Sequence, residues 1–167
     1  YGATVIHPKT IKPLQDANIP LLVKPFLQPQ ESGTTISSLA RSTSKTSAII
    51  VKNNQVLLSL TIRDHSFITE AHLSDAFRAF AENHIKINLM QNSAISFSIC
   101  FDWEETRFKR LINKLERDYK LKYNNNLSLI TVRHFNRELL QKLITGKTVL
   151  LEQFSRNTAQ LVLKEPV

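Results

Sequence analysis

The sequence predicts an α+β fold of small antiparallel sheets, each covered on one face by helices. Three observations support this prediction. Segments with apolar residues at every second position alternate with segments in which apolar residues are three and four positions apart. The order of these segments repeats in part along the chain. The 167 residues, of which 42% are hydrophobic, suffice for one ordinary domain or two small ones.

Residues 1–36 form a first unit that is rich in turn signals. His7-Pro8 is an extended or turn-forming pair, because proline disfavours the helical conformation of the residue before it. A short helix is predicted over 10–18, with Pro13 in its first turn, and a buried strand at 21–23. We interpret His7 as part of a structural turn and not as a catalytic residue.

The chain changes character after this unit. Residues 37–47 contain seven Ser or Thr and no large aromatic residue, which is typical of a linker. The elements predicted beyond it are strands at 48–51 and 55–63 joined by a turn at Asn53-Asn54, a helix at 72–84, strands at 85–90 and 94–101, a helix at 104–119, a strand at 120–123 and a turn at 124–126. Residues 55–124 therefore follow the ferredoxin-like order, in which two helices cover one face of a sheet.

A partial second copy of this order follows. A strand is predicted at 127–134, and Asn136 is a suitable N-cap for a helix that ends before Gly146. Two more strands follow at 149–154 and 159–163. This copy lacks a last helix and strand, and 48–51 is a spare strand that can cover its edge. We therefore predict two sheets, with the first unit (55–124) inserted into the second (48–54 and 125–167).

The net charge of +8 raises the alternative of a basic ferredoxin-like domain that binds RNA. The distribution of charge argues against it, because the basic residues at 107–122 are interleaved with acidic residues and suit a solvated helix. The aromatic residues Phe97 and Phe101 share a predicted face with Ile95 and Ile99, a composition typical of a core. We expect no nucleic-acid partner.

Other function classes are also disfavoured. No apolar run approaches the ~20 residues of a membrane-spanning helix, so we expect no membrane partner. Cys100 is the only cysteine and lies in an alternating run, which predicts a half-buried strand residue and fits a cytoplasmic protein. The five histidines show no metal-binding spacing, so we predict no metal site.

Several short motifs occur in a fixed order. In residues 1–36 they are Gly2-Ala3-x-Val5-Ile6-His7-Pro8, Ile19-Pro20-Leu21-x-Val23-Lys24 and Gly33-Thr34-x-Ile36. Further on they are Leu73-Ser74-Asp75-Ala76-Phe77 leading into Ile85-Lys86-Ile87-Asn88-Leu89-Met90-Gln91-Asn92-Ser93, and Gln153-x-Ser155-Arg156-Asn157 followed by Ala159-Gln160-Leu161-Val162. Together they resemble aspartate kinases: the first set resembles the end of the amino-acid-kinase catalytic domain, and the others resemble the paired ACT regulatory units.

The resemblance implies a regulatory region that senses an end-product amino acid, lysine or threonine, and forms a homodimer through its ACT units. It also implies that the first ACT unit is inserted into the second. The parent enzyme would use ATP and Mg to phosphorylate aspartate. This segment has three glycines and no paired ones, so nothing in it can cradle a triphosphate. We therefore expect no catalytic residue and no cofactor in this fragment.

An amino-acid effector needs partners for its ammonium and its carboxylate. We expect the site where the loop 64–70 enters a helix, whose free N–H groups suit a carboxylate, opposite the strand at 86–93. Each polar residue there can also serve as a cap or turn residue, which the sequence leaves open. The predicted effector-binding residues are Asp64, Ser66, Leu73, Ser74, Ile87, Asn88, Gln91, Asn92 and Ser93.

The effector itself stays open between lysine and threonine. The lysine-sensitive pattern of the family has aspartate where Asn88 stands, and Thr-Ser-Glu where Asn92-Ser93-Ala94 stands. Both acidic groups that would suit a lysine side chain are therefore absent. A further alternative for the parent is a bifunctional aspartate kinase–homoserine dehydrogenase.

Overall fold

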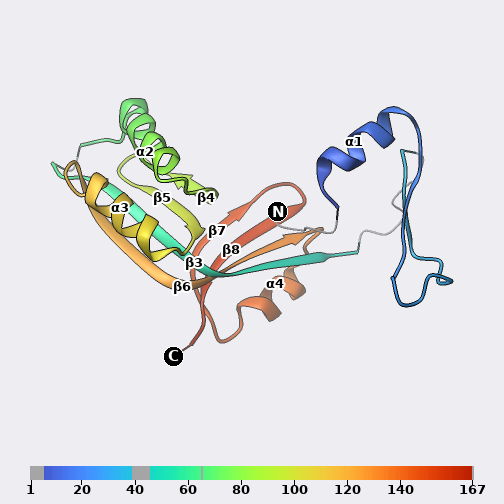
Figure 1. Cartoon of the computed structure of the whole chain (residues 1–167). Helices are drawn as coiled ribbons and strands as arrows, with labels where there is room; N and C mark the ends of the chain where they lie inside the picture. The colour runs from blue at the N-terminus through green and yellow to red at the C-terminus, as the bar shows by residue number, and fades with distance from the viewer. Residues whose placement is uncertain (1–5, 39–45, 65, 167) are drawn as a thin grey trace. The chain divides into compact units, whose positions relative to one another are not determined.

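The chain divides into two compact units, Tyr1–Thr46 and Ser47–Val167. The computed structural model describes residues 6–38, 46–64 and 66–166 (Figure 1). Residues 2–5 of the first motif, most of the predicted linker at 37–47, and His65 lie outside the described residues. The two units are treated separately below.

The described residues of the small unit, 6–38 and 46, contain one helix and a two-stranded antiparallel sheet. Helix α1 (Pro8–Asp16) is capped by His7, whose Nδ1 accepts a hydrogen bond from the Lys9 N–H at 3.2 Å. Strands β1 (Leu21–Val23) and β2 (Thr34–Ile36) pair with each other. The helix begins earlier than predicted, because proline is well tolerated at the first helical position. Pro13 consequently lies inside the helix and not in its first turn.

Gly33 is required by the turn before β2. Its φ is +65°, and a Cβ at this position would overlap the carbonyl oxygen of Val23. We expect Gly33→Ala to disrupt the pairing of β1 with β2, measured as loss of amide-hydrogen protection in both strands.

Gly146 provides the matched control, because its φ is +75° but no atom lies within 4 Å of the added Cβ. Gly146→Ala should carry only the conformational cost, about 1–2 kcal/mol. Equal loss of protection in the strands that flank the two glycines would contradict the steric explanation.

The large unit is built on one six-stranded antiparallel sheet with the order β4-β5-β3-β6-β8-β7. Figure 1 shows α2 and α3 over one half of this sheet and α4 beside the other half. The strands are β3 (Ala48–Ile62), β4 (Ile87–Asn92), β5 (Phe97–Asp102), β6 (Tyr119–Arg133), β7 (Thr148–Phe154) and β8 (Thr158–Lys164), and the helices are α2 (Glu70–Glu82), α3 (Glu105–Leu115) and α4 (Arg137–Ile144).

Two long strands, β3 and β6, run through both halves of this sheet and pair along almost their whole length. The predicted turn at Asn53-Asn54 is wrong, and so is the turn at 124–126. Both segments are register shifts between β3 and β6, with Asn54 and Asn126 at φ near +56° and +55°. Because the strands continue through these irregularities, there is one shared sheet where two were predicted.

Three apolar clusters hold the large unit together. The first lies under α2 and α3 and includes Phe80, Phe101 and Leu111. The second lies under α4 and is centred on Ile130, Val132, Leu161 and Leu163. The third joins the helix-free faces of the two halves and consists of Leu57, Leu89, Cys100, Leu127, Leu129, Leu151 and Val162. The sheet therefore bends, so that its two helix-free faces pack on each other.

Other predicted boundaries also differ from the structure. Strand β5 begins at Phe97, and Ile95 is 56% exposed in the turn before it instead of facing the core. Helix α3 ends at Leu115, four residues earlier than predicted, and Tyr119 instead begins β6. The α+β fold class itself, with ferredoxin-like units in tandem, is confirmed.

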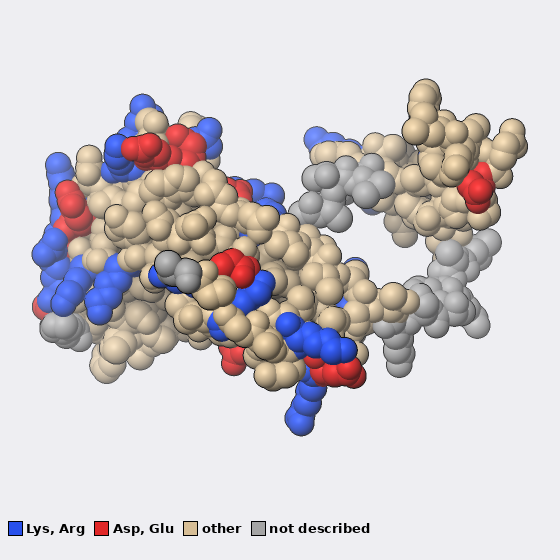
Figure 2. Space-filling view, turned by 90° about the horizontal axis from the view of Figure 1, so that it is seen from below, with Lys and Arg blue, Asp and Glu red and all other residues tan. Residues whose placement is uncertain are grey.

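The surface of the large unit mixes basic and acidic side chains (Figure 2). Several of them form ion pairs, among them Lys109 with Glu105, Arg107 with Glu104, and Lys114 with Glu82. Such exposed pairs contribute little to stability, about 0–1 kcal/mol each. Among the described residues, no helix is long and apolar enough to cross a membrane.

Candidate functional site

The loop before α2 and the β4–β5 turn lie next to each other. The Ile68 N–H donates to the Ala94 carbonyl at 2.8 Å, which connects the two segments. Thr69 is the N-cap of α2, and its N–H donates to Nδ1 of His72 at 3.1 Å. The start of α2 is therefore held against the turn, as the predicted effector site requires.

The predicted polar residues at this end take part in local hydrogen bonds. The Ser66 N–H donates to Asp64 Oδ1 at 2.9 Å. Ser93 and Ser96 exchange hydrogen bonds across the turn, including Ser93 N–H to the Ser96 carbonyl at 2.8 Å. Asn92 is exposed at the end of β4. Asn92 and Ser93 therefore lie at the end of β4 that the Ile68–Ala94 hydrogen bond connects to the loop.

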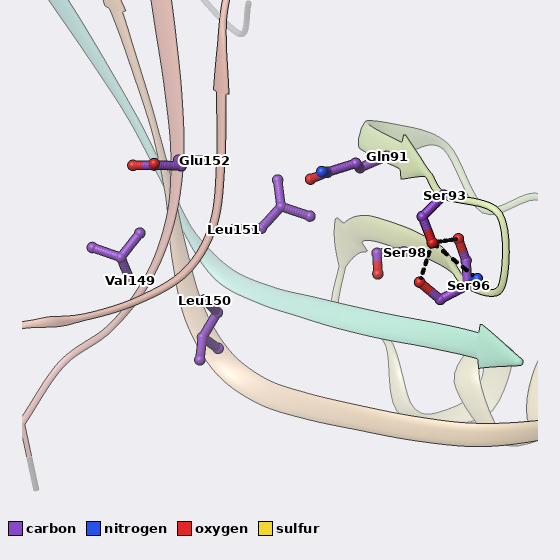
Figure 3. A pocket seen from close by; sticks show the side chains of 8 residues that line it. All are labelled: Gln91, Ser93, Ser96, Ser98, Val149, Leu150, Leu151 and Glu152. Atoms are coloured by element: carbon purple, nitrogen blue, oxygen red, sulfur yellow. Dashed lines mark hydrogen bonds between the residues drawn. The ribbon is translucent and has the colours of Figure 1, made fainter.

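The remaining predicted residues are spread over α2 and β4. Leu73 and Ile87 are half-buried and pack against the apolar cluster under the helices, whereas Ser74 is exposed on α2. Together with Ser93 and Ser96 of the β4–β5 turn, Gln91 lines a cleft of about 490 Å³ between the β4–β5 hairpin and β7. Figure 3 shows its side chain pointing toward Leu151.

Asn88 lies at the opposite end of β4, in a polar network. Its Nδ2 donates to Gln55 Oε1 at 2.8 Å and to Asp102 Oδ1 at 3.1 Å, and its Oδ1 accepts from Lys52 Nζ at 2.9 Å. Gln55 is fully buried, and its Nε2 donates to Asp102 Oδ1 at 2.7 Å and to the Asn53 carbonyl at 3.0 Å. The network joins β3, β4 and β5 where β3 shifts register.

Sequence reasoning missed Lys52, Gln55 and Asp102. A signal was present, because Gln55 is a polar residue directly before the apolar run of β3. A glutamine at such a position needs partners in the core, since a buried amide without hydrogen bonds is unfavourable. Its partners are distant in the sequence and could not be named from the pattern.

The predicted effector residues therefore form two groups along β4. Strand geometry of about 3.3 Å per residue places the backbones of Asn88 and Asn92 about 13 Å apart. The first group is the loop, the start of α2 and the Asn92–Ser93 end. The second group is Asn88 with its network.

Cys100 is fully buried beside this network, and its Sγ lies 3.8 Å from Gln55 Oε1. Burial, reinforced by the nearby Asp102 carboxylate and opposed by Lys52, raises the pKa of the thiol to about 12. Since only the thiolate reacts readily, we expect alkylation at pH 8 to be at least ~100-fold slower in the folded protein than in urea. Equal rates would contradict the burial.

The same shift makes stability depend on pH. The unfolded thiol titrates near 9.0 and the folded one near 12, so the folded state holds its proton longer. The Cys100 contribution is therefore intact below pH 9 and is lost at about 1.4 kcal/mol per pH unit as the pH rises above it.

The described residues contain no group of three or more His, Cys, Asp or Glu placed to hold a metal ion.

Comparison with curated proteins finds aspartokinases. Aspartokinase 1 of Arabidopsis thaliana chloroplasts is 25% identical over 133 residues, which is 79% of this chain and 23% of that protein. The lysine-sensitive aspartokinase 3 of Escherichia coli is 28% identical over 105 residues, 61% of this chain and 22% of that protein. The chain thus spans about a quarter of the length of these relatives. No family model matches it.

Solved structures agree with this result at the level of the fold. Escherichia coli aspartokinase III in complex with lysine and aspartate has a TM-score of 0.76 at 18% identity, covering 96% of this chain and 39% of that one. A putative C-terminal regulatory domain of aspartate kinase from Porphyromonas gingivalis has a TM-score of 0.60 at 13% identity, covering 73% and 88%. The fold is therefore that of paired ACT regulatory units.

The matches in sequence and in fold point to the same family. They confirm the resemblance to aspartate kinases over most of the chain. In fold, the chain is similar to the regulatory part of aspartate kinases.

Proposed function

We propose that this chain binds an amino-acid effector, lysine or threonine, and forms a homodimer through its first ACT unit. The complete protein would phosphorylate aspartate with ATP and Mg in amino-acid biosynthesis, and its catalytic activity would respond to the effector. The names of the relatives support this proposal: one is called lysine-sensitive, and one solved relative holds lysine and aspartate.

The single observation that carries the dimer proposal is the position of β4. It is an end strand of the sheet, and among the described residues it pairs with β5 alone, which leaves its other edge open. An open strand edge favours pairing with another strand. Met90, in the middle of β4, is 47% exposed. Pairing β4 with β4 of a second copy would close the open edge and bury Met90.

A twofold axis near Met90 would also complete the effector site. In antiparallel pairing of two β4 strands about this residue, Asn88 of one copy lies opposite Asn92 of the other. The loop group of one subunit would then meet the Asn88 group of its mate. The two groups lie about 13 Å apart along one strand, and each would find its complement across the dimer.

The exposed apolar side chains around this edge support the same arrangement. They are Phe67 in the loop, Ile95 in the β4–β5 turn, Met90 on β4 and Phe77 on α2. Phe77 forms an edge-to-face contact with Phe97 of β5, at 5.5 Å between ring centroids, so its ring lies over β5, next to β4. Apolar groups gathered in this way are typical of an interaction surface.

The small unit supports the proposal of a larger catalytic domain. Phe26 is 95% exposed and Leu27 is 90% exposed, and Ile19 and Leu22 are more than half exposed. So small a unit rarely leaves four large apolar side chains in water. We infer that they pack against the rest of an amino-acid-kinase domain in the complete protein.

Sedimentation equilibrium and calorimetric titration with lysine and threonine test the proposal. We expect a dimer at micromolar concentration, one bound amino acid per site, and a Met90→Lys variant that is shifted toward monomer. Phe154→Lys, which adds the same charge at a half-exposed position on the opposite edge strand β7, is the control and should remain dimeric. A wild-type monomer that neither amino acid dimerises would contradict the proposal.

A further inference from the structure

Lys52 is a charged residue outside the first ACT unit whose side chain reaches Asn88. It lies on β3 opposite Leu129, just before the register shift, and its side chain is half-buried. Its Nζ donates to Asn88 Oδ1 at 2.9 Å. The described residues show no carboxylate within 4.0 Å of Nζ, so the ammonium is held by an amide oxygen and not by an ion pair.

The orientation of the Asn88 amide is fixed by its other partners. Its N–H₂ group donates to two acceptors, Gln55 Oε1 and Asp102 Oδ1, which leaves only the oxygen to accept from Lys52. An aspartate at position 88 would place two carboxylates side by side. The network therefore presents a single neutral oxygen, with the Asp102 carboxylate close behind it, which is a suitable environment for one ammonium group.

We propose that Lys52 places its own ammonium group at the Asn88 oxygen, where the side-chain ammonium of a lysine effector would otherwise bind, and thereby excludes effectors that carry a second positive charge. The α-ammonium that all amino acids share would bind at another place in the site. This inference rests on the proposed effector function and specifies its chemistry. A ligand with a cationic side chain must displace Lys52 or lie against a like charge in a half-buried place. A ligand with an uncharged hydroxyl side chain meets neither obstacle.

The structure therefore assigns the site to small amino acids with an uncharged side chain and makes Lys52 the residue that determines this specificity. Lys52 can reach this site because β3 is shared by the two units: it belongs to the second ACT unit up to Lys52 and to the first beyond Gln55. A residue of the second unit thus sets the selectivity of a site in the first.

Calorimetric titration of the full chain with L-lysine and L-threonine tests this inference. We expect wild type to bind threonine more tightly than lysine. Lys52→Met should gain about tenfold in lysine affinity and leave threonine affinity unchanged, because it removes one like charge while keeping the length of the side chain. Lys52→Arg keeps the charge and should behave as wild type.

Lys122→Met is the matched control, since it removes the same charge from an exposed position on β6 outside the network. If the affinity for lysine also rises in this variant, the rise reflects overall charge and overturns the inference. Adding Asn88→Leu to Lys52→Met should abolish the rise in lysine affinity, which would show that lysine binds at Asn88. Lys52→Ala, which vacates the subsite entirely, serves as a second variant if the methionine variant does not fold.

The possible results separate the two proposals. If no Lys52 variant gains lysine affinity, the inference about Lys52 is wrong, whatever wild type binds. If wild type binds neither amino acid but Lys52→Met binds lysine, the subsite exists and is filled by Lys52, and the proposed effector function of the natural chain fails.

Discussion

Replacing Phe101 with alanine is expected to lower the free energy of unfolding of the large unit by about 3–5 kcal/mol. Phe101 is fully buried on β5 and lies between the two helices: its ring centroid is 5.2 Å from that of Phe80 on α2 and 6.3 Å from that of Phe108 on α3. Its removal leaves a cavity that neither helix can close without moving. Urea unfolding followed by far-ultraviolet circular dichroism measures the change.

Phe154→Ala, on β7 away from the proposed dimer surface, is the matched control for this experiment. The side chain of Phe154 is 50% exposed, so its removal should change the free energy of unfolding by about 1 kcal/mol or less. Similar losses in both variants would mean that α2 and α3 do not pack on β5 as the structure shows.

Gln55→Leu is expected to lower the free energy of unfolding by about 2–3 kcal/mol, although leucine has a similar volume and is more hydrophobic. The substitution removes the acceptor of Asn88 Nδ2 and the donor to Asp102 and to the Asn53 carbonyl. These groups lie at the register shift of β3, and Gln55 is fully buried beside them. The same urea titration measures the loss.

Gln160→Leu provides the comparison, because Gln160 is only half-buried and the hydrogen bond of its side-chain amide to Thr131 Oγ1 is long at 3.4 Å. Its replacement should be close to neutral. A Gln55→Leu variant as stable as wild type would show that water replaces the lost partners, and that the network does not hold the shift in place.

The sequence was most informative where one face of an element is buried. Alternation at Val56, Leu58 and Leu60 predicts the buried face of β3, and all three side chains are buried under the helices. The three- and four-residue spacing of Phe108, Leu111 and Leu115 predicts the inner face of α3 equally well. In both cases the periodicity reflects contact with a single core, which is a local property.

The sequence was least informative where local and distant interactions compete. Asn53-Asn54 has the composition of a turn, and Asn54 does adopt a left-handed conformation. The same conformation serves a bulge inside a long strand, and only pairing with residues near Leu127 distinguishes the two outcomes. The shared sheet and the Gln55 network both depend on this distant pairing, so neither followed from the pattern.

The pairing of β3 with β6 has a consequence for the rate of folding. Ala48 pairs with Arg133 and Ile62 with Tyr119. Most of the inserted unit therefore lies between the two paired strands in the sequence and forms the loop that this pairing closes. Closure of such long loops is entropically unfavourable, and folding slows as contacts become more distant in sequence. The contacts within the first unit join residues that are closer in sequence and can form early. The second half of the sheet can form only when the first residues of β3 and the last residues of β6 are both available. Nascent chains would therefore expose the strand from Ala48 to Lys52 until synthesis has passed Arg133.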